Sequence, residues 1–201
     1  MPRELEAKHR VESLVPVRTA LERLGATMEL RCVEWNQIFD TPEGRLKDRR
    51  IGLRLRTLDR AETPTGAGVP CISGGATLTF KGPPERSAYK SREEVEVVVN
   101  HPAGMVELLG GLGFIRVLGY AKRREHWRLG ECHVELDELP QLGCFVEVEG
   151  PSEQAIDATR QQCGLTACPL VRESYVGLVS SHLSNLGNLG RELRFDTEPA
   201  L

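Results

Sequence analysis

The sequence predicts an α+β fold that is mainly β, a closed barrel of eight antiparallel strands with flanking α-helices. Eight segments alternate between apolar and polar residues with period two, which is the pattern of strands. Four shorter stretches change to helical spacing, with apolar residues every three or four positions. The polar faces of the strands are charged, whereas the helices have apolar faces that must pack against something. A closed barrel satisfies both requirements, because its charged strand faces point inward and its apolar faces receive the helices.

The predicted strands are separated by clear turn signals. They span residues 3–11, 28–39, 51–58, 76–82, 88–99, 115–129, 131–138 and 143–149. The segment Asp40-Thr41-Pro42-Glu43-Gly44 is a turn, because Asp can bond its own backbone, Pro fixes φ and Gly adopts a left-handed conformation. Leu129-Gly130 closes a tight hairpin. Residues 59–75 are rich in Gly, Pro and Thr, which predicts a long loop.

The predicted helices lie between and after the strands. Residues 13–25 repeat leucine or valine at helical spacing, with Ser13 as the N-cap and Gly25 as the stop. The other helices are expected at 102–112, at 152–163 with Ser152 as the N-cap, and at 172–181. These elements predict one domain over residues 1–182, followed by a C-terminal tail over 183–201.

Composition and charge restrict the class of protein. The 201 residues are 40% hydrophobic and 27% charged, and the net charge of −3 argues against binding nucleic acid or membranes through bulk positive charge. No pattern of stacked aromatic residues lies on the charged faces. No apolar run approaches the roughly 20 residues of a membrane span, and the N-terminus lacks a signal-peptide core. The six cysteines form no CxxC pair, which predicts reduced thiols in a cytoplasmic protein.

The charged strand faces are the most informative feature. Glu4, Glu6 and Lys8 share one face of the first strand, and later strands carry pairs of one sign. These could be solvated outer faces. The segregation of the charges and the apolar faces of the helices favour a barrel interior instead. That interior would contain eight acids and eight bases, namely Glu4, Glu6, Glu94, Glu96, Glu135, Asp137, Glu147, Glu149, Lys8, Arg10, Arg54, Arg56, Lys81, Arg92, Lys122 and Arg124.

Such an interior needs partners for its charges, because an unpaired buried ion costs several kcal/mol or more. Internal ion pairs can satisfy part of this balanced set. A polyanion accompanied by hard cations would satisfy the rest. Carboxylate pairs suit Mg²⁺ or Mn²⁺, which prefer oxygen ligands. Arginine pairs suit phosphate oxygens, which they bind bidentately.

Short motifs recur on these strands in a fixed order. Glu4-Leu5-Glu6-Ala7-Lys8 has the form ExExK. It is followed by Phe39-Asp40-Thr41-Pro42, Leu53-Arg54-Leu55-Arg56, Phe80-Lys81-Gly82-Pro83, Arg92-Glu93-Glu94-Val95-Glu96, Lys122-Arg123-Arg124, Leu136-Asp137, residues 142–149 and Ser174-Tyr175. ExExK alone is a weak signal, but the ordered set, from residue 3 to about 180, resembles the CYTH superfamily, the triphosphate tunnel metalloenzymes. The resemblance implies an eight-stranded antiparallel tunnel that binds a triphosphate.

The resemblance also implies a role for each charged residue. The metal ligands would be Glu4, Glu6, Glu147 and Glu149, assisted by Asp137 and Glu94. The phosphate-binding residues would be Lys8, Arg54, Arg56, Lys81 and Arg124, with Lys122 and Arg92 as additions. The expected catalytic set is Glu4, Glu6, Lys8, Arg54, Arg56, Glu147 and Glu149. Glu96 and Glu135 are interpreted as pairing residues and Arg10 as structural.

Some residues have alternative roles. Lys122 and Arg124 could pair with Glu94 or Glu96 rather than bind phosphate. Three histidines, His9, His126 and His133, are placed on or beside the apolar faces, which favours packing or solvent exposure over acid–base chemistry.

The expected activity is metal-dependent hydrolysis of a triphosphate, which could be tripolyphosphate, a nucleoside triphosphate or thiamine triphosphate. If the ribose 3′-oxygen attacks the α-phosphorus instead, the product is cyclic AMP, as in the class IV adenylyl cyclases that the chain also resembles. Hydrolysis is favoured because it requires no adenine pocket. A non-catalytic barrel that binds polyphosphate or nucleotides, and a structural barrel with internal salt bridges, are the alternatives. The metal, the substrate and the oligomeric state, a homodimer included, stay open.

Overall fold

The computed structural model describes residues 3–62, 75–84, 90–187 and 191–196, with side chains left out at 3–4, 59–62 and 90–91. Eight strands form the body of the molecule, namely β1 (Arg3–Val11), β2 (Thr27–Asp40), β3 (Gly52–Glu62), β4 (Ala76–Lys81), β5 (Lys90–Val99), β6 (Ile115–Leu129), β7 (Cys132–Leu139) and β8 (Gly143–Glu149). Five helices accompany them, namely α1 (Val15–Arg23), α2 (Arg45–Asp48), α3 (Pro102–Gly111), α4 (Glu153–Gln162) and α5 (Tyr175–Asn185).

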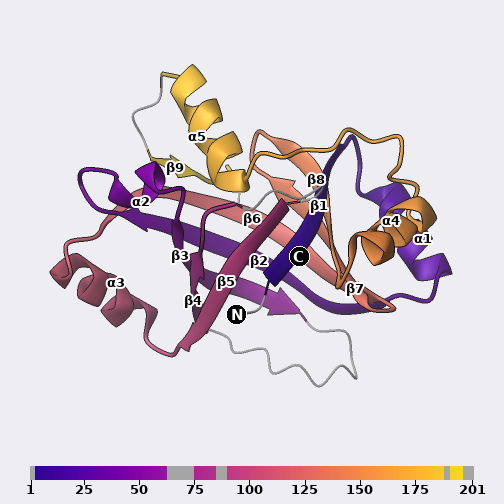
Figure 1. The fold of residues 1–201 in the computed structure, drawn as a ribbon, viewed down its shortest axis with the longest axis horizontal. Helices are drawn as coiled ribbons and strands as arrows, with labels where there is room; N and C mark the ends of the chain where they lie inside the picture. The colour runs from indigo at the N-terminus through magenta and orange to yellow at the C-terminus, as the bar shows by residue number, and fades with distance from the viewer. Residues whose placement is uncertain (1–2, 63–74, 85–89, 188–190, 197–201) are drawn as a thin grey trace.

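The strands follow one another around a ring in the order β2-β3-β4-β5-β1-β8-β7-β6, and β6 pairs back onto β2 (Figure 1). Every neighbouring pair in this ring is antiparallel. The ladder between β1 and β5 is short, from Arg3 opposite Glu93 to Glu6 opposite Lys90, so the barrel closes only along part of its length. The predicted fold class, mainly β with an eight-stranded antiparallel tunnel, is confirmed.

The helices pack on the outside of the strands through apolar residues. Helices α1 and α4 lie together at one end of the molecule and α3 lies at the other (Figure 1). Leu21 of α1 and Ile156 of α4 pack on the buried outer faces of β7 and β8. Leu109 of α3 packs on Leu55 and Val99. The outer faces are therefore apolar and covered in these regions, as the sequence predicts. None of the described helices is long and apolar enough to cross a membrane.

Helix α5 spans Tyr175–Asn185 rather than the predicted 172–181. Ser174 caps its N-terminus by accepting a hydrogen bond from the Gly177 N–H at 3.2 Å. The preceding residues run beside β1, where the Val171 N–H donates to the Lys8 carbonyl at 2.8 Å. Val179 and Leu183 follow Tyr175 at helical spacing and are buried with it. This attachment places the start of α5 against the barrel interior.

Two small elements differ from the sequence-based prediction. Helix α2 is only four residues long and has no apolar periodicity. A carboxylate holds it, because Asp40 accepts hydrogen bonds from the backbone N–H groups of Thr41, Leu46 and Lys47 at 2.7, 2.8 and 3.0 Å. Strand β9 (Glu192–Leu193) pairs in parallel with β6, inside the predicted tail. The boundary at residue 182 stays a prediction.

The predicted loop at 59–75 and the predicted reduced cysteines can also be compared with the structure. Strand β3 continues to Glu62, into the predicted loop 59–75, and residues 63–74 of that loop lie outside the described residues. Five cysteines are free thiols, namely Cys32, Cys132, Cys144, Cys163 and Cys168, as predicted, and Cys71 lies outside the described residues.

Candidate active site inside the barrel

The barrel and helix α5 enclose a cavity of about 1240 Å³. Most of the sequence-predicted site residues line it, namely Glu6, Lys8, Arg54, Arg56, Lys81, Arg92, Glu94, Lys122, Arg124, Glu147 and Glu149. They come from six different strands, so the alternation along each strand brings together residues that are far apart in the sequence. Glu96 and Glu135, the expected pairing residues, line the cavity as well.

Three predicted interior residues remain, of which Glu4 is not tested and Asp137 and Arg10 are placed differently. The backbone of Glu4 pairs with Arg92 across the β1–β5 ladder, and its side chain is outside the described set. Asp137 is fully buried and does not line the cavity. Arg10 is exposed, donates to the Leu142 carbonyl at 3.0 Å and lies over the Phe145 ring, which fits the structural role expected for it.

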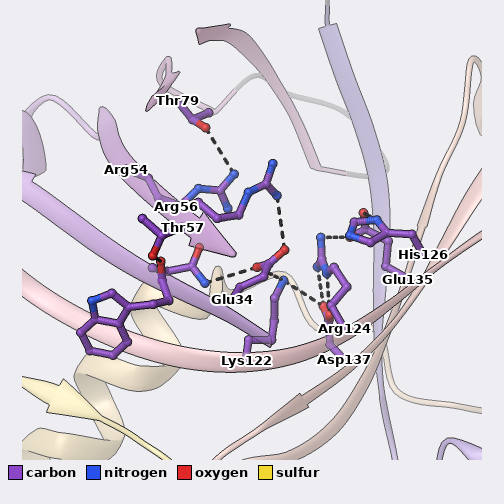
Figure 2. A network of polar contacts seen from close by, with 12 residues as sticks. Glu34, Arg54, Arg56, Thr57, Thr79, Lys122, Arg124, His126, Glu135 and Asp137 are labelled. Carbon is purple, nitrogen blue, oxygen red and sulfur yellow. Dashed lines mark hydrogen bonds and ion pairs between the residues drawn. The ribbon is translucent and has the colours of Figure 1, made fainter. Parts of the chain in front are cut away.

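Arg124 is the centre of the acidic wall formed by β7 and β8. Its Nε donates to Asp137 at 2.6 Å and its Nη1 contacts Glu135 (Figure 2). Its Nη2 donates to Glu147 at 2.6 Å. The expected alternative, pairing of Arg124 with Glu94 or Glu96, is wrong, because the β6–β7 register places Arg124 opposite Asp137. Burial alone would lower the pKa of Arg124, but the Asp137, Glu135 and Glu34 carboxylates outweigh burial and raise it well above its usual value.

Lys122 lies between two buried carboxylates. Its Nζ is 3.3 Å from Glu34 and 3.4 Å from Asp137, so its expected pairing with Glu94 or Glu96 is also wrong (Figure 2). Glu34 has 0% exposure and also contacts Arg56 at 3.4 Å. Burial would raise the pKa of Glu34, but Lys122, Arg56 and Arg124 together hold it well below its usual range. Glu34 is not among the sequence-predicted site residues, although it and Asn36 alternate with apolar residues on a predicted strand.

The opposite wall, from β3 to β5, carries looser ion pairs. Glu96 accepts from the Thr79 hydroxyl at 2.7 Å and lies 3.7 Å from Arg54 and 3.8 Å from Arg56. Lys81 pairs with Glu94 at 2.9 Å. Arg54 and Arg56 therefore present guanidinium groups to the cavity without a tight carboxylate contact to Glu96.

The three histidines divide between the two faces. His126 lines the cavity and its Nδ1 lies 3.2 Å from Glu135, so its expected place on or beside an apolar face is wrong (Figure 2). It follows Lys122 and Arg124 at two-residue spacing on β6, which places all three on the inner face. His9 is buried outside the cavity against Cys168 and Arg160, and His133 is exposed, as expected.

The carboxylates differ in how well they could hold a divalent metal ion. Glu135, Asp137 and Glu147 bring oxygens within 4.8 Å of one another, but Arg124 contacts all three. Glu6 and Glu149 stand directly opposite each other in the β1–β8 ladder, and both line the cavity. Carboxylate oxygens are hard donors, which suit a divalent cation. A divalent ion would therefore fit beside Glu6 and Glu149, which present such oxygens to the cavity.

Part of the cavity lining is apolar. It comes from β2, β3, β6 and α5 and consists of Ile38, Leu53, Val117, Leu118, Val176 and Leu183. Lys47 of α2, Arg50 shortly after α2, and Arg191 add positive charge to the lining. Arg50 has a left-handed backbone conformation, with φ of 58°. The cavity thus combines a charged chamber with an apolar lining surface.

Comparison with known proteins gives relatives of similar length. The adenylate cyclase CyaB of Aeromonas hydrophila is 27% identical over 191 residues, which cover 90% of this chain and 91% of the relative. The solved structure of a candidate adenylate cyclase from Vibrio parahaemolyticus matches with a TM-score of 0.74 and 20% identity, covering 88% of this chain and 97% of the other.

A third match is the adenylyl cyclase candidate HpAC1 from Hippeastrum, for which a dominant triphosphatase activity is described. It aligns with a TM-score of 0.61 and 19% identity, covering 94% of this chain and 97% of the other. The family model of the CYTH domain matches residues 2–162. This chain therefore belongs to the CYTH domain family.

Proposed function

We propose that this chain hydrolyses a triphosphate inside the barrel cavity and uses Mg²⁺ or Mn²⁺ to do so. Members of the CYTH family are metal-dependent adenylyl cyclases or triphosphatases, so the chain is an enzyme of one of these kinds. The observation that carries the proposal is the content of one cavity. It combines the opposed carboxylates Glu6 and Glu149 with cations from both walls.

The cations would bind the triphosphate by exchanging partners. Arg54 and Arg56 make contacts to Glu96 that are longer than a tight charge-assisted hydrogen bond. A phosphate group accepts two parallel N–H bonds from a guanidinium group, so both arginines gain by turning toward phosphate. Lys8 on β1 and Lys122 on β6 also line the cavity, where they can neutralise further oxygens. The phosphate chain would therefore lie among these four cations.

Glu6 and Glu149 would hold the metal ion beside the phosphate chain, with Glu4, on the same strand, and Glu147 as further predicted ligands. A divalent ion held by these residues would supply charge neutralisation and would lower the pKa of the water molecule that attacks. Asp137 is not a ligand in this proposal, because Arg124, Lys122 and Tyr175 already occupy its oxygens. Its role is to fix those three side chains.

One observation supports a second candidate function, the conversion of ATP to cyclic AMP and pyrophosphate. The apolar part of the cavity lining, with Ile38, Val117 and Leu183, could receive an organic group attached to the triphosphate. Bare tripolyphosphate has no use for such a surface. The relative from Aeromonas hydrophila is named an adenylate cyclase. Hydrolysis stays the first candidate, because it needs only the charged chamber.

Product analysis tests these proposals. The purified protein is given ATP and tripolyphosphate in parallel, with Mg²⁺ or Mn²⁺. Orthophosphate release that is lost in Glu6→Gln, but kept in the exposed control Glu22→Gln on α1, supports hydrolysis. Cyclic AMP as the main product supports the cyclase. Absence of both products, with retained tripolyphosphate binding in EDTA, would leave a non-catalytic binding barrel. The expected cytoplasmic location and the oligomeric state remain predictions.

A further inference from the structure

The side chain of Tyr175 extends from the first residue of α5 into the barrel and is 7% exposed. Its ring packs edge-on against Phe145, with the ring centroids 5.4 Å apart. Its hydroxyl donates a hydrogen bond to Asp137 Oδ2 at 2.7 Å. The C-terminal helix therefore contributes an aromatic side chain to the chamber that is otherwise built from strands.

Two buried lysines of the candidate site lie over this one ring. The Nζ atom of Lys8 is 3.9 Å from the ring centroid, and that of Lys122 is 5.0 Å from it. Both distances fall within the roughly 6 Å over which an ammonium group is attracted to an aromatic face. Both lysine side chains are only 2% exposed, and the attraction is larger where water is excluded.

The same stretch of chain also fixes Lys8 directly. Its Nζ donates to the carbonyl of Glu173, two residues before Tyr175, at 3.1 Å, and pairs with Glu147 at 3.2 Å. Lys122 shares Asp137 with the Tyr175 hydroxyl. The ring thus contacts both lysines, which come from different strands, β1 and β6. The Glu173 carbonyl also holds Lys8, and the hydroxyl holds the Asp137 carboxylate that Lys122 contacts.

We propose that Tyr175 is a positioning residue that sets the two ammonium groups of Lys8 and Lys122 for binding the phosphate chain, so that helix α5 is a working part of the active site. The role in substrate binding rests on the proposed function, whereas the positioning itself does not. The ring holds the lysines and the hydroxyl holds Asp137.

An acid–base role for this tyrosine fits the surroundings less well. Burial, with the nearby carboxylates of Asp137 and Glu147, raises the pKa of Tyr175 well above its usual value. The phenol therefore keeps its proton at neutral pH and donates a hydrogen bond to Asp137. A side chain that stays neutral can orient charges without adding one of its own to the chamber.

The positioning is tested by proton NMR of protein with labelled lysine, and the chain has five lysines to resolve, Lys8, Lys47, Lys81, Lys90 and Lys122. Ring current shifts protons above an aromatic face upfield. The ε-methylene signals of Lys8 and Lys122 should be shifted upfield in the natural protein and in Tyr175→Phe, and should return toward ordinary values in Tyr175→Leu. Ordinary shifts in the natural protein would overturn the positioning, whatever the activity.

The effect on binding is tested by calorimetric titration of tripolyphosphate in EDTA. Tyr175→Leu should weaken binding about tenfold, and Tyr175→Phe, which keeps the ring, should stay within about twofold of the natural protein. The matched control is His182→Ala on the same helix, because His182 contacts Gln141 at 3.0 Å and does not line the cavity. This control should bind normally.

The outcomes separate the two proposals. If the natural protein does not bind tripolyphosphate, the proposed function fails, while the NMR result still decides the positioning. If the natural protein binds but Tyr175→Leu binds equally well, the role of Tyr175 in binding is refuted. A Phe variant that folds and binds as weakly as the Leu variant would also refute the role given to the ring.

Discussion

Glu6 lies directly opposite Glu149 across the β1–β8 ladder, and both side chains line the same cavity. The replacement Glu149→Gln keeps the size of the side chain and removes one charge from this pair. We expect the natural protein to be stabilised by saturating Mn²⁺, by about 2.7 kcal/mol at a concentration 100 times the Kd. Most of this stabilisation should be lost in Glu149→Gln. Thermal unfolding with and without the ion measures it, and an undiminished shift would place the metal elsewhere.

Arg124 contacts three carboxylates on the inner face, whereas its neighbour Arg123 pairs with Glu138, both of them partly exposed. Removing this buried cation takes away the guanidinium group that pairs with Glu135, Asp137 and Glu147. Arg124→Met should therefore lower the free energy of unfolding by about 3–5 kcal/mol. Arg123→Met should cost about 1 kcal/mol or less. Urea unfolding of the two variants gives the comparison, and equal losses would contradict the buried network.

His9 predicts a dependence of stability on pH. Its Nδ1 lies 3.0 Å from the Cys168 carbonyl, and its Nε2 accepts from Arg160 Nε at 2.8 Å, so the ring is neutral. Burial, with a contribution from Arg160, lowers its pKa below 6.5. Below pH 6.5 the unfolded chain therefore binds a proton at His9 that the folded protein does not bind. The contribution of His9 to the free energy of unfolding is complete above pH 6.5 and is lost as the pH falls toward the lowered pKa. Urea unfolding at pH 7.5 and 5.5 should show this loss, and His9→Gln should reduce it.

Asp40 predicts a local effect where α2 borders the cavity. Its carboxylate accepts from three backbone N–H groups and is 5% exposed, so Asp40→Ala leaves those groups without their acceptor. The expected cost is about 1–3 kcal/mol. Hydrogen exchange of the Leu46 and Lys47 amides should become faster, and Asp40→Asn, which keeps one acceptor oxygen, should lie between. Unchanged exchange would mean that α2 is held by other contacts.

Most of the barrel could be predicted from local patterns alone. The strands at 115–129 and 143–149 agree with the sequence-based bounds, because long period-two alternation ends there at clear turns. Helix α2 and strand β9 could not be found in this way. Helix α2 is held by the side chain of Asp40, a few residues before it, and β9 is held by the far earlier strand β6. Neither element shows an apolar periodicity in the sequence.

For the site residues, too, local alternation predicts which way a side chain points, whereas its partners depend on how the strands and helices pair. The inward direction of Lys122 and Arg124 follows from alternation along β6, and the same alternation places His126 on the inner face with them. Glu34 could be placed on the inner face, but its importance depends on the register that brings β3 and β6 beside it. Tyr175 carries no charge and lies on a helix, so no strand pattern could connect it with Lys8.

The paired interior also determines how the two ligands of the proposed reaction affect one another. Arg54 and Arg56 contact Glu96, and Lys81 contacts Glu94, so a phosphate group that binds these cations releases carboxylate oxygens into the chamber. Released carboxylates increase the affinity for a divalent ion, and a bound ion in turn attracts the phosphate chain. Binding of metal and triphosphate is then positively cooperative, and thermodynamic linkage makes the enhancement equal in both directions.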